Sequence, residues 1–457
     1  MILRNNPQAL NTIKALVFIL ALIVTTAEAQ EKITLQQAVE ITLQNNLQIK
    51  QSKLNEALSG EDVRQSKLYF YPTLNASAGL DFNFGRSVDP LTYEYVNRQI
   101  TTSSGNAGTS LPLFQGFRLW NQVSQFKYQL EADKSSTRKI QNDLSLTVVT
   151  TYLQILSNQD LLTAAQQQLD LAKLQLDREQ KQFDVGSKTL ADLSQAKAQV
   201  ATAEMNVTNA RNQVDISYLN LAQLMERDPA NKFEVEKPVV NQLSDINQTP
   251  APEIYSKSVD TYPDIQLAHF RTLSASKAVD VARSGLFPRL SFSGNLGTGY
   301  SSNRYEQADN SGAMEKVKFS DQLSDNFNQT LGFTLSIPIF NNYSSRIQLR
   351  KAKINYQNAR VSEQLARNDF NKIIYQAVTD LRAAESRYNS ANSAFQSSRD
   401  AFNAIQQRYN VGLVNSLDFN QAQTDLNQKE FDLIQARYNL IFRNKIIDFY
   451  LGNPLTF

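Results

Sequence analysis

The stretch FDVGSKTLADLSQA at residues 183–196 occurs again, in altered form, as YNVGLVNSLDFNQA at residues 409–422. These two stretches lie 226 positions apart, and so do LPLF at 111–114 and IPIF at 337–340. Matches that keep one offset over about a hundred residues do not arise by chance, so they indicate an internal duplication. The sequence therefore predicts two copies of one structural unit.

A further sequence match near the start of each copy and a proline-rich segment between them define the boundaries of the copies. YPTL at 71–74 matches FPRL at 287–290 with an offset of 216, so ten residues of length difference fall in the intervening loop. A proline-rich connector separates the copies. We predict a signal peptide, a first helix–strand–strand–helix repeat, a connector and a second repeat, at residues 1–29, 30–227, 228–253 and 254–457.

The N-terminus has the pattern of a cleaved secretory signal. Arg4 and Lys14 flank the start of an apolar run at 15–24, and AEA at 27–29 fits a cleavage site. The run is too short to span a bilayer, and a retained N-terminal anchor is the alternative. No later stretch is continuously apolar over about eighteen residues. We expect an exported protein that enters a membrane, if at all, as a β-barrel.

Apolar residues with 4-3 spacing, typical of a coiled-coil seam, run through residues 144–183. These residues belong to the first copy, where the seam positions read Leu, Val, Thr, Ile, Asn, Leu, Ala, Leu, Ala, Leu, Glu and Phe. The same positions in the second copy run from Phe370 to Tyr409 and are apolar or aromatic except at Ser398. The other faces are polar, which favours a wall one helix thick over an ordinary coiled-coil bundle, the alternative.

Glycine marks the turns of these long helices. A second apolar seam begins after Gly186, and Gly412 occupies the matching position in the second copy. We expect both glycines to lie in tight turns of two very long helical hairpins. Further helices at 33–70 and 254–286 complete the two copies.

Alternating apolar and polar residues adjoin four prolines, which are Pro72, Pro112, Pro288 and Pro338. Each alternating run is about ten residues long, the length of a membrane-spanning strand, although the run before Pro112 is weak. A half-buried sheet shows the same alternation. Aromatic residues at the strand–helix junctions favour a membrane barrel, because such residues form interfacial girdles.

Four strands cannot close a barrel, and open strand edges must be paired. We therefore expect several chains to share one barrel by cyclic symmetry, and three chains give twelve strands. The predicted fold class is mainly α with membrane β. Long coiled-coil hairpins form its helical part, and four strands per chain contribute to a β-barrel that several chains share.

The composition excludes several kinds of function. The 46 basic and 44 acidic residues nearly cancel, which gives no reason to expect a nucleic-acid partner. The chain has no Cys and one His, so thiol nucleophiles and disulfides are excluded and metal or His-based chemistry is not expected. We predict no enzymatic activity, no metal and no cofactor. His269 is expected to be a surface or packing residue.

Taken together, the duplication, the four prolines and the hairpin tips resemble the TolC family of outer-membrane efflux proteins. The segment GLVNSLDFNQAQTDL at 412–426 and the pair QARY at 435–438 and LG at 451–452 are similar to that family's tip and last helix. The resemblance covers essentially the whole mature chain. It implies a homotrimer in the lipid of the outer membrane, with a helical tunnel in the periplasm.

The resemblance also implies partners. Such a channel is the passive exit duct of a tripartite efflux or type I secretion system. It docks a periplasmic adaptor, the membrane fusion protein, and is coupled to an inner-membrane pump of the RND, ABC or a similar class. The pump supplies the energy and selects the substrate. We expect the adaptor to dock at the hairpin tips, represented by Phe183, Val185, Gly186, Val411 and Gly412.

The same resemblance implies a periplasmic gate at the tips. Asp192, Tyr409 and Asp418 match family positions there, and the hypothesis is that Asp192 and Tyr409 latch neighbouring helices while Asp418 lines the constriction. The alternative is that both acids are helix caps, because T-x-x-D and N-x-x-D resemble helix N-termini. Val414 and Gln421 replace an Arg and an Asp common in the family, which predicts a weaker ionic gate.

Two other functions compete with the duct. A periplasmic coiled-coil adaptor or scaffold would show one hairpin flanked by lipoyl-like and barrel segments, not two copies with strand pairs. An enzyme such as a cell-wall hydrolase would need a convergent catalytic set, and the sequence offers none.

Overall fold

The computed structural model describes residues 31–88, 91, 93–97, 99–237, 249–308 and 313–453. The predicted signal peptide and much of the predicted connector lie outside these residues. The chain divides into two compact units. Unit 1 comprises residues 1–51, 139–260 and 370–457, and unit 2 comprises 52–138 and 261–369. Both units draw on both sequence copies.

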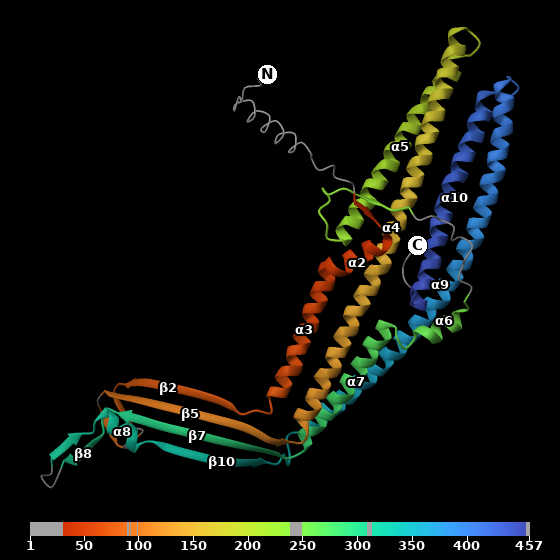
Figure 1. The fold of residues 1–457 in the computed structure, drawn as a ribbon. Coiled ribbons are helices and arrows are strands. Elements are labelled where there is room, and N and C mark those ends of the chain that lie inside the picture. Colours follow the sequence, from red (N-terminus) through yellow and green to blue (C-terminus); the bar gives the residue numbers. More distant parts are fainter. Residues whose placement is uncertain are drawn as a thin grey trace, which may run out of the picture. The chain divides into compact units, whose positions relative to one another are not determined.

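Unit 2 contains one antiparallel sheet of four strands in the order β10-β7-β5-β2, visible in Figure 1. The strands are β2 (Thr73–Asn83), β5 (Ile100–Gln115), β7 (Arg289–Ser301) and β10 (Asn328–Ser336). All four predicted strands are thus present. The central pair β5–β7 joins the two copies, because β5 belongs to the first and β7 to the second.

The strand before Pro112, which looked weak in the sequence, is the longest, with 16 residues. It continues through Pro112 because a bulge between Pro112 and Phe114 absorbs the missing N–H donor. Pro72 and Pro288 directly precede β2 and β7, and Pro338 follows β10. Three of the prolines therefore flank a strand end, and Pro112 lies inside β5, three residues before its end.

The sheet has two different faces. The register places Leu74, Leu80, Phe292 and Phe333 on one face, which we call the apolar face. The opposite face carries Asn, Ser, Thr and Gly at nearly every position, and we call it the polar face. Leu74 is 79% exposed and Phe333 is 72% exposed, so the apolar face is uncovered in the single chain. An uncovered apolar face of this kind is typical of strands that meet lipid.

Short elements follow the outer ends of the strands. They are the hairpins β3 (Arg86–Val88) with β4 (Tyr95–Asn97) and β8 (Tyr305–Ala308) with β9 (Ala313–Lys316), and the helix α8 (Phe319–Asp325). α8 packs against β7, where Thr298 Oγ1 donates to the Leu323 carbonyl at 2.7 Å. The Phe319 and Tyr300 rings lie 5.0 Å apart.

Two long helices, α4 (Arg118–Asp184) and α9 (Ser344–Asn410), begin directly after tight junctions. At the first junction Gly116 and Phe117 both have positive φ, and at the second Asn342 and Tyr343 do. These pairs are again 226 positions apart, so the duplication preserved a backbone conformation that is rare for aromatic residues. Unit 2 contains the first parts of α4 and α9, most of α3 (Leu47–Leu68), and α7 (Pro263–Arg283), which a short 3₁₀ turn η2 (Ser284–Leu286) follows.

The predicted helices 33–70 and 254–286 are each broken. The first divides into α2 (Leu35–Asn45) and α3, and the second into α6 (Ala251–Ser258) and α7. Asn46 has extended geometry after α2, and Tyr262 is extended because Pro263 follows it. Asn46 and Tyr262 are 216 positions apart, so the break belongs to the duplicated unit.

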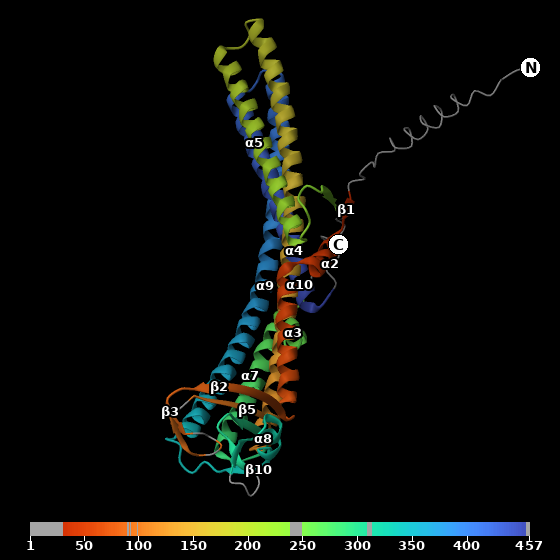
Figure 2. The same cartoon turned by 90° about the vertical axis from the view of Figure 1, so that its left-hand side faces the viewer.

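Unit 1 contains two helical hairpins. α4 pairs with α5 (Leu190–Leu224), and α9 pairs with α10 (Ser416–Leu451), and each pair runs side by side in Figure 1 and Figure 2. The first hairpin packs small residues, including Ala165, Ala172 and Ala203. The long uninterrupted helices predicted from the seams are therefore confirmed.

A larger core holds the N-terminal strand of unit 1. β1 (Glu31–Ile33) pairs in parallel with β6 (Phe233–Val235). The buried Tyr152 hydroxyl donates to the Ile33 carbonyl at 3.0 Å and the Glu236 carbonyl at 2.8 Å as alternative acceptors. Burial raises the pKa of Tyr152, so the hydroxyl stays a donor at physiological pH. Within the described residues, no helix combines the length and apolarity that a membrane crossing requires.

Candidate functional site

The two hairpin tips of unit 1 have the same backbone design. Gly186 and Gly412 have φ of +74° and +78°, the left-handed region that favours glycine. At the first tip the N–H of Gly186 bonds to the Phe183 carbonyl at 2.9 Å, and the next residue bonds to the Gln182 carbonyl at 2.9 Å. The second tip repeats both bonds at the matching positions. This pair of bonds is a Schellman motif, which satisfies the last carbonyl groups of a helix.

The helix after each tip begins with a side-chain cap. Thr189 Oγ1 accepts from the Asp192 N–H at 3.2 Å, and Asp192 Oδ2 accepts from the Thr189 N–H at 3.2 Å, which makes a capping box. At the second tip, Asn415 Oδ1 accepts from the Asp418 N–H at 2.8 Å. Both acids therefore lie in the first turn of a helix, in the positions that the cap alternative predicted.

Asp192 makes a second contact, across to the other hairpin. Ser416 Oγ donates to Asp192 Oδ1 at 2.7 Å, while Thr189 Oγ1 donates to Asp192 Oδ2 at 2.7 Å. These hydrogen bonds, with the one from Ser416 largest, lower the pKa of Asp192 to about 2. The carboxylate is therefore ionised at any physiological pH. Asp192 caps its own helix and binds the neighbouring hairpin at once.

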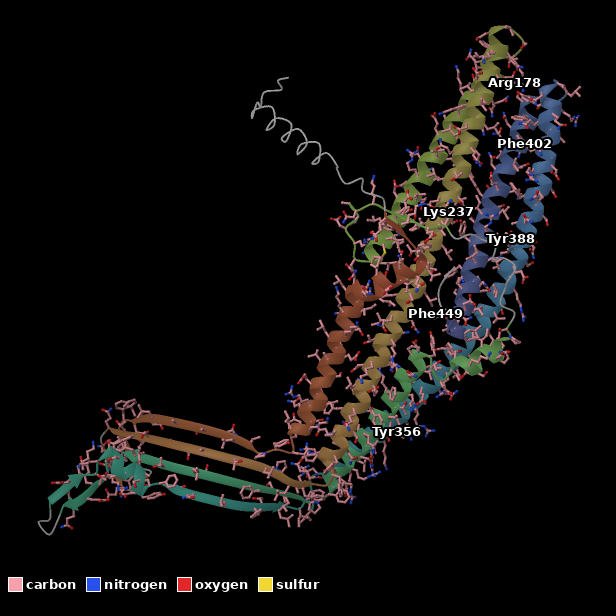
Figure 3. The ribbon with its side chains drawn as sticks, in the orientation of Figure 1. Arg178, Lys237, Tyr356, Tyr388, Phe402 and Phe449 are labelled. Carbon is pink, nitrogen blue, oxygen red and sulfur yellow. The ribbon has the colours of Figure 1, made fainter. Side chains whose placement is uncertain are left out.

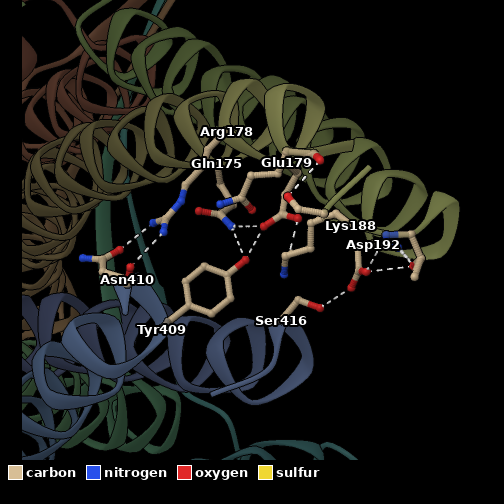
Figure 4. A network of polar contacts seen from close by, with 11 residues as sticks. Gln175, Arg178, Glu179, Lys188, Asp192, Tyr409, Asn410 and Ser416 are labelled. Atoms are coloured by element: carbon tan, nitrogen blue, oxygen red, sulfur yellow. Dashed lines mark hydrogen bonds and ion pairs between the residues drawn. The ribbon is translucent and has the colours of Figure 1, made fainter. Parts of the chain in front are cut away.

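Tyr409 also joins the two hairpins, through a residue that the sequence analysis did not select (Figure 4). Its hydroxyl donates to Glu179 Oε1 on α4. Gln175 Nε2 lies 2.8 Å from both the Tyr409 hydroxyl and Glu179 Oε1. Glu179 is 2% exposed, so these polar groups are shielded from water. Burial, followed by the Glu179 carboxylate, raises the pKa of Tyr409 and keeps its proton in place.

Two cations of the first hairpin surround the Tyr409 ring. Lys188 Nζ lies 5.2 Å from the ring centroid and Arg178 Cζ lies 5.3 Å from it. Lys188 Nζ is also 3.6 Å from Glu179 Oε2, an oxygen that accepts no hydrogen bond from the described residues. Arg178 Nη1 donates to Asn410 Oδ1 at 2.5 Å. Glu179 is thus a buried carboxylate with a positive charge beside it, which is the arrangement that buried charges require.

The second hairpin supplies the aromatic side of this contact. Tyr409 stacks on Phe419 with the ring centroids 4.6 Å apart, and Phe402 lies 5.5 Å from Phe419. Leu171 of α4 packs against this aromatic cluster. Figure 3 labels Arg178 on α4 and Phe402 on α9, both in the tip-ward parts of the hairpins of unit 1. We call the set Gln175, Arg178, Glu179, Lys188, Asp192, Tyr409, Asn410 and Ser416 the tip contact.

The structure places the predicted gate residues in two groups. Asp192 and Tyr409 both belong to the tip contact, but each binds its own partner across the hairpins, Ser416 and Glu179, and they do not bind one another. Asp418 lies outside the contact with an exposed side chain. The sequence did carry a sign of Glu179, because it is the one charged residue in an otherwise apolar or small seam.

The tips end in exposed apolar side chains. Val185 is 79% exposed, Val411 is 70% exposed, and Leu190, Leu413 and Leu417 are 65–70% exposed. Phe183, in contrast, is partly buried. Single exposed apolar residues are ordinary on protein surfaces, but five of them at two adjoining turns form a candidate binding surface. Of the residues predicted to dock an adaptor, Val185 and Val411 are the most accessible side chains.

A sheet with an exposed apolar face and a small polar face, joined in one chain to two glycine-tipped helical hairpins, defines a membrane channel protein with a helical extension. The chain belongs to the outer membrane efflux protein family, whose sequence profile matches residues 38–226 and 254–453. It is therefore an efflux protein of the outer membrane, as the resemblance predicted. The matches support this function and not the periplasmic adaptor alternative, and the relatives are channel proteins rather than enzymes.

Individual relatives agree with this assignment. The outer membrane efflux protein BepC of Brucella suis biovar 1 is 21% identical over 405 residues, which cover 88% of this chain and 82% of BepC. A crystal structure of CusC has a TM-score of 0.77 at 17% identity and covers 92% of both chains. The outer membrane protein VceC of Vibrio cholerae has a TM-score of 0.74 at 18% identity, covering 92% of this chain and 96% of VceC. At these identities the structural likeness establishes the fold.

Proposed function

We propose that three copies of this chain form one passive exit duct in the outer membrane. The sheets of unit 2 close a twelve-stranded barrel, with the apolar faces toward lipid and the polar faces toward a water-filled lumen. The helices of unit 1 line the periplasmic part of the duct. The observation that carries this proposal is the sheet itself, because its two edge strands, β2 and β10, have no partner strand among the described residues.

The way in which the end of β7 is covered supports the view that the edges of β2 and β10 pair with other chains. β7 extends beyond β10, and there the chain covers the exposed main chain with side-chain amides. Gln322 accepts from the Ser301 N–H at 2.9 Å and donates to the Ser301 carbonyl at 3.0 Å. Asn326 Nδ2 donates to the Gly299 carbonyl at 2.7 Å. Side chains thus satisfy the main-chain groups of β7 that β10 does not reach. The edges of β2 and β10 have no such cover, which suits pairing with other copies of the chain.

The mass of the particle extracted by detergent from the outer-membrane fraction tests this proposal. Light scattering with the detergent subtracted should give three chains. A monomer or dimer in the soluble periplasmic fraction would overturn the shared barrel. Cyclic closure by three chains is expected because four strands per chain are too few to close a barrel and a closed ring removes every edge.

The duct is coupled to a periplasmic adaptor and an inner-membrane pump, and the adaptor docks at the tips. The five exposed apolar side chains there support this, because burying them against a partner is favourable. Gly186→Pro and Gly412→Pro should abolish adaptor capture, since proline cannot adopt a φ near +75°. Val185→Ser with Val411→Ser should weaken capture while leaving both turns intact. Trimers of the proline variants that export normally would contradict docking at the tips.

The tip contact is the gate of the duct. Asp192 and Tyr409 hold the two hairpins of one chain together through Ser416 and Glu179, and Asp418 faces the constriction. Asp192→Ala and Asp418→Ala should each raise the conductance of the reconstituted channel. The first removes a bond between hairpins and the second removes a charge from the narrowest ring. Unchanged conductance in both variants would contradict the gate.

A further inference from the structure

The polar face of the sheet carries almost no charged residues, so the two that it does carry stand out as candidates for a function. Within β2, β5, β7 and β10 the register assigns only Asp81 and Arg289 as charged residues on that face. Both side chains are exposed in the single chain. Neither forms an ion pair or a side-chain hydrogen bond with the described residues. A charged side chain that has no partner among the described residues is available to act on a solute that passes it.

The two charges lie at opposite ends of the sheet. Asp81 pairs with Thr102, which pairs with Ser301 at the loop end of β7. Arg289 is the first residue of β7 and pairs with Ser336, the last of β10. Twelve residues of strand separate Arg289 from Ser301, which is about 40 Å along an extended chain. The two charges therefore act on different zones of the lumen.

The carboxylate of Asp81 lies close to other residues of the polar face. A Cβ placed on Gly79 would be 3.9 Å from Asp81 Oδ2 and 3.1 Å from Ser104 Oγ. On the same face, a Cβ on Gly299 would be 3.9 Å from Leu91 Cδ2, so the Leu91 side chain lies over this end of the polar face. Asp81 thus lies at the end of the polar face where Leu91 also reaches over the strands.

We propose that Asp81, repeated in three copies, is a selectivity ring near the outer mouth of the duct that favours cationic over anionic solutes. The inference rests on the proposed trimeric barrel. Twelve strands about 4.8 Å apart and tilted by about 40° close on a radius of about 12 Å. Side chains that point inward then come within about 10 Å of the axis, one Debye length at 0.1 M salt. Arg289 forms an opposite ring at the other end of the barrel.

The electrostatic potential at the Asp81 ring can be measured with a single introduced cysteine, because the chain has no Cys of its own. Ser104→Cys places a reporter beside Asp81 on the polar face, and Leu80→Cys places a control on the apolar face. The full-length protein in liposomes is treated with a cationic or an anionic methanethiosulfonate reagent, and the ratio of the two reaction rates measures the local potential. Closed tips do not interfere, since the reagents enter from the loop end.

The ratio of cationic to anionic rates at Ser104→Cys should fall about fivefold when Asp81→Asn is added, and Asp81→Glu should preserve it. At a Thr334→Cys reporter, Arg289→Gln should move the ratio in the opposite direction. Equal reaction of Ser104→Cys and Leu80→Cys would overturn the barrel, and this inference with it. A reactive Ser104→Cys with an unreactive Leu80→Cys and no response to Asp81→Asn would overturn the selectivity ring alone.

Discussion

The two hairpin tips of unit 1 have the same backbone and different chemistry. Each has a glycine with φ near +75°, the same pair of turn bonds and a capped helix after it. The side chains that meet between them differ. The first tip contributes acids and cations, with Glu179 and Lys188 at the centre, and the second contributes the aromatic pair Tyr409 and Phe419. Duplication kept the residues that shape each turn, and the residues that face the other turn diverged into complementary sets.

Glu179, the buried acid of the first tip, should contribute more than any other side chain to the free energy that holds the two tips together. Glu179→Ala leaves the Tyr409 hydroxyl and the Lys188 ammonium without their partner, at a cost of about 3 kcal/mol. Hydrogen exchange of the tip peptides measures this cost as the free energy of opening. As a control, Glu204→Ala removes an exposed acid of the same hairpin, 3.8 Å from Lys173, and should cost less than about 1 kcal/mol. Equal effects of the two variants would contradict a special role of Glu179.

The aromatic side of the comparison is tested by removing one oxygen atom. Tyr409→Phe keeps the stacking on Phe419 and removes the hydroxyl donor, which should cost about 1–2 kcal/mol in the same exchange measurement. Tyr388→Phe makes the same change on the same helix, where the hydroxyl has no hydrogen bond to the described residues, and should be nearly neutral. If both variants behave alike, the hydroxyl is not what joins the hairpins.

The two caps should differ in strength, although both follow the same turn. Thr189→Ala breaks a reciprocal capping box, whereas Asn415→Ala removes one bond to the Asp418 N–H. We expect losses of about 1.5 and about 1 kcal/mol respectively, read as faster exchange in the first turns of α5 and α10. Thr189 also donates to Asp192, so its loss should further weaken the Ser416 contact. An equal or reversed order would show that the reciprocal bond adds nothing.

The smallest expected effect is the response of the tips to acid. Because hydrogen bonds lower the pKa of Asp192 to about 2 from an ordinary value of 3.8, its ionised form stabilises the folded tip. This contribution is complete above about pH 4 and is lost as the pH falls toward 2. Tip opening corrected for intrinsic exchange should therefore be unchanged from pH 7 to pH 5 and easier at pH 3. Asp192→Asn should remove the part of the acid response that comes from this group.

Sequence patterns predicted the parts of the fold that local chemistry determines. The glycine turns, the caps and the alternating strands each depend on residues within a few positions of one another. Both helix breaks were missed. Asn46 inside an apolar pattern carries no strong stop signal, and at the matching break the stop signal of Pro263 was present in the sequence but was not used. β5 looked weak because the run before Pro112 carries small or polar residues where the other strands carry large apolar ones. Its length depends on pairing with β2 and β7, which no local pattern shows.

The tip contact was only half predicted, for a related reason. Tyr409 and Asp192 were selected because they match family positions, but their partners Glu179 and Ser416 lie 230 and 224 positions away. No local pattern links residues so far apart, and the charged residue in the first seam was the only sign of Glu179. Which side chains of the two tips meet depends on the tertiary packing of the hairpins, and the sequence does not show it.

The central claim is that Glu179 and Tyr409 act as one unit that holds the duct closed. Single-channel recordings of Glu179→Gln, Tyr409→Phe and the double variant, all as reconstituted trimers, test it most directly, because they give the open probability. The account predicts that each single variant raises the open probability and that the double variant exceeds neither by much, because either change breaks the same bond. Additive effects, or an open probability like that of the unmodified channel in all three variants, would contradict it.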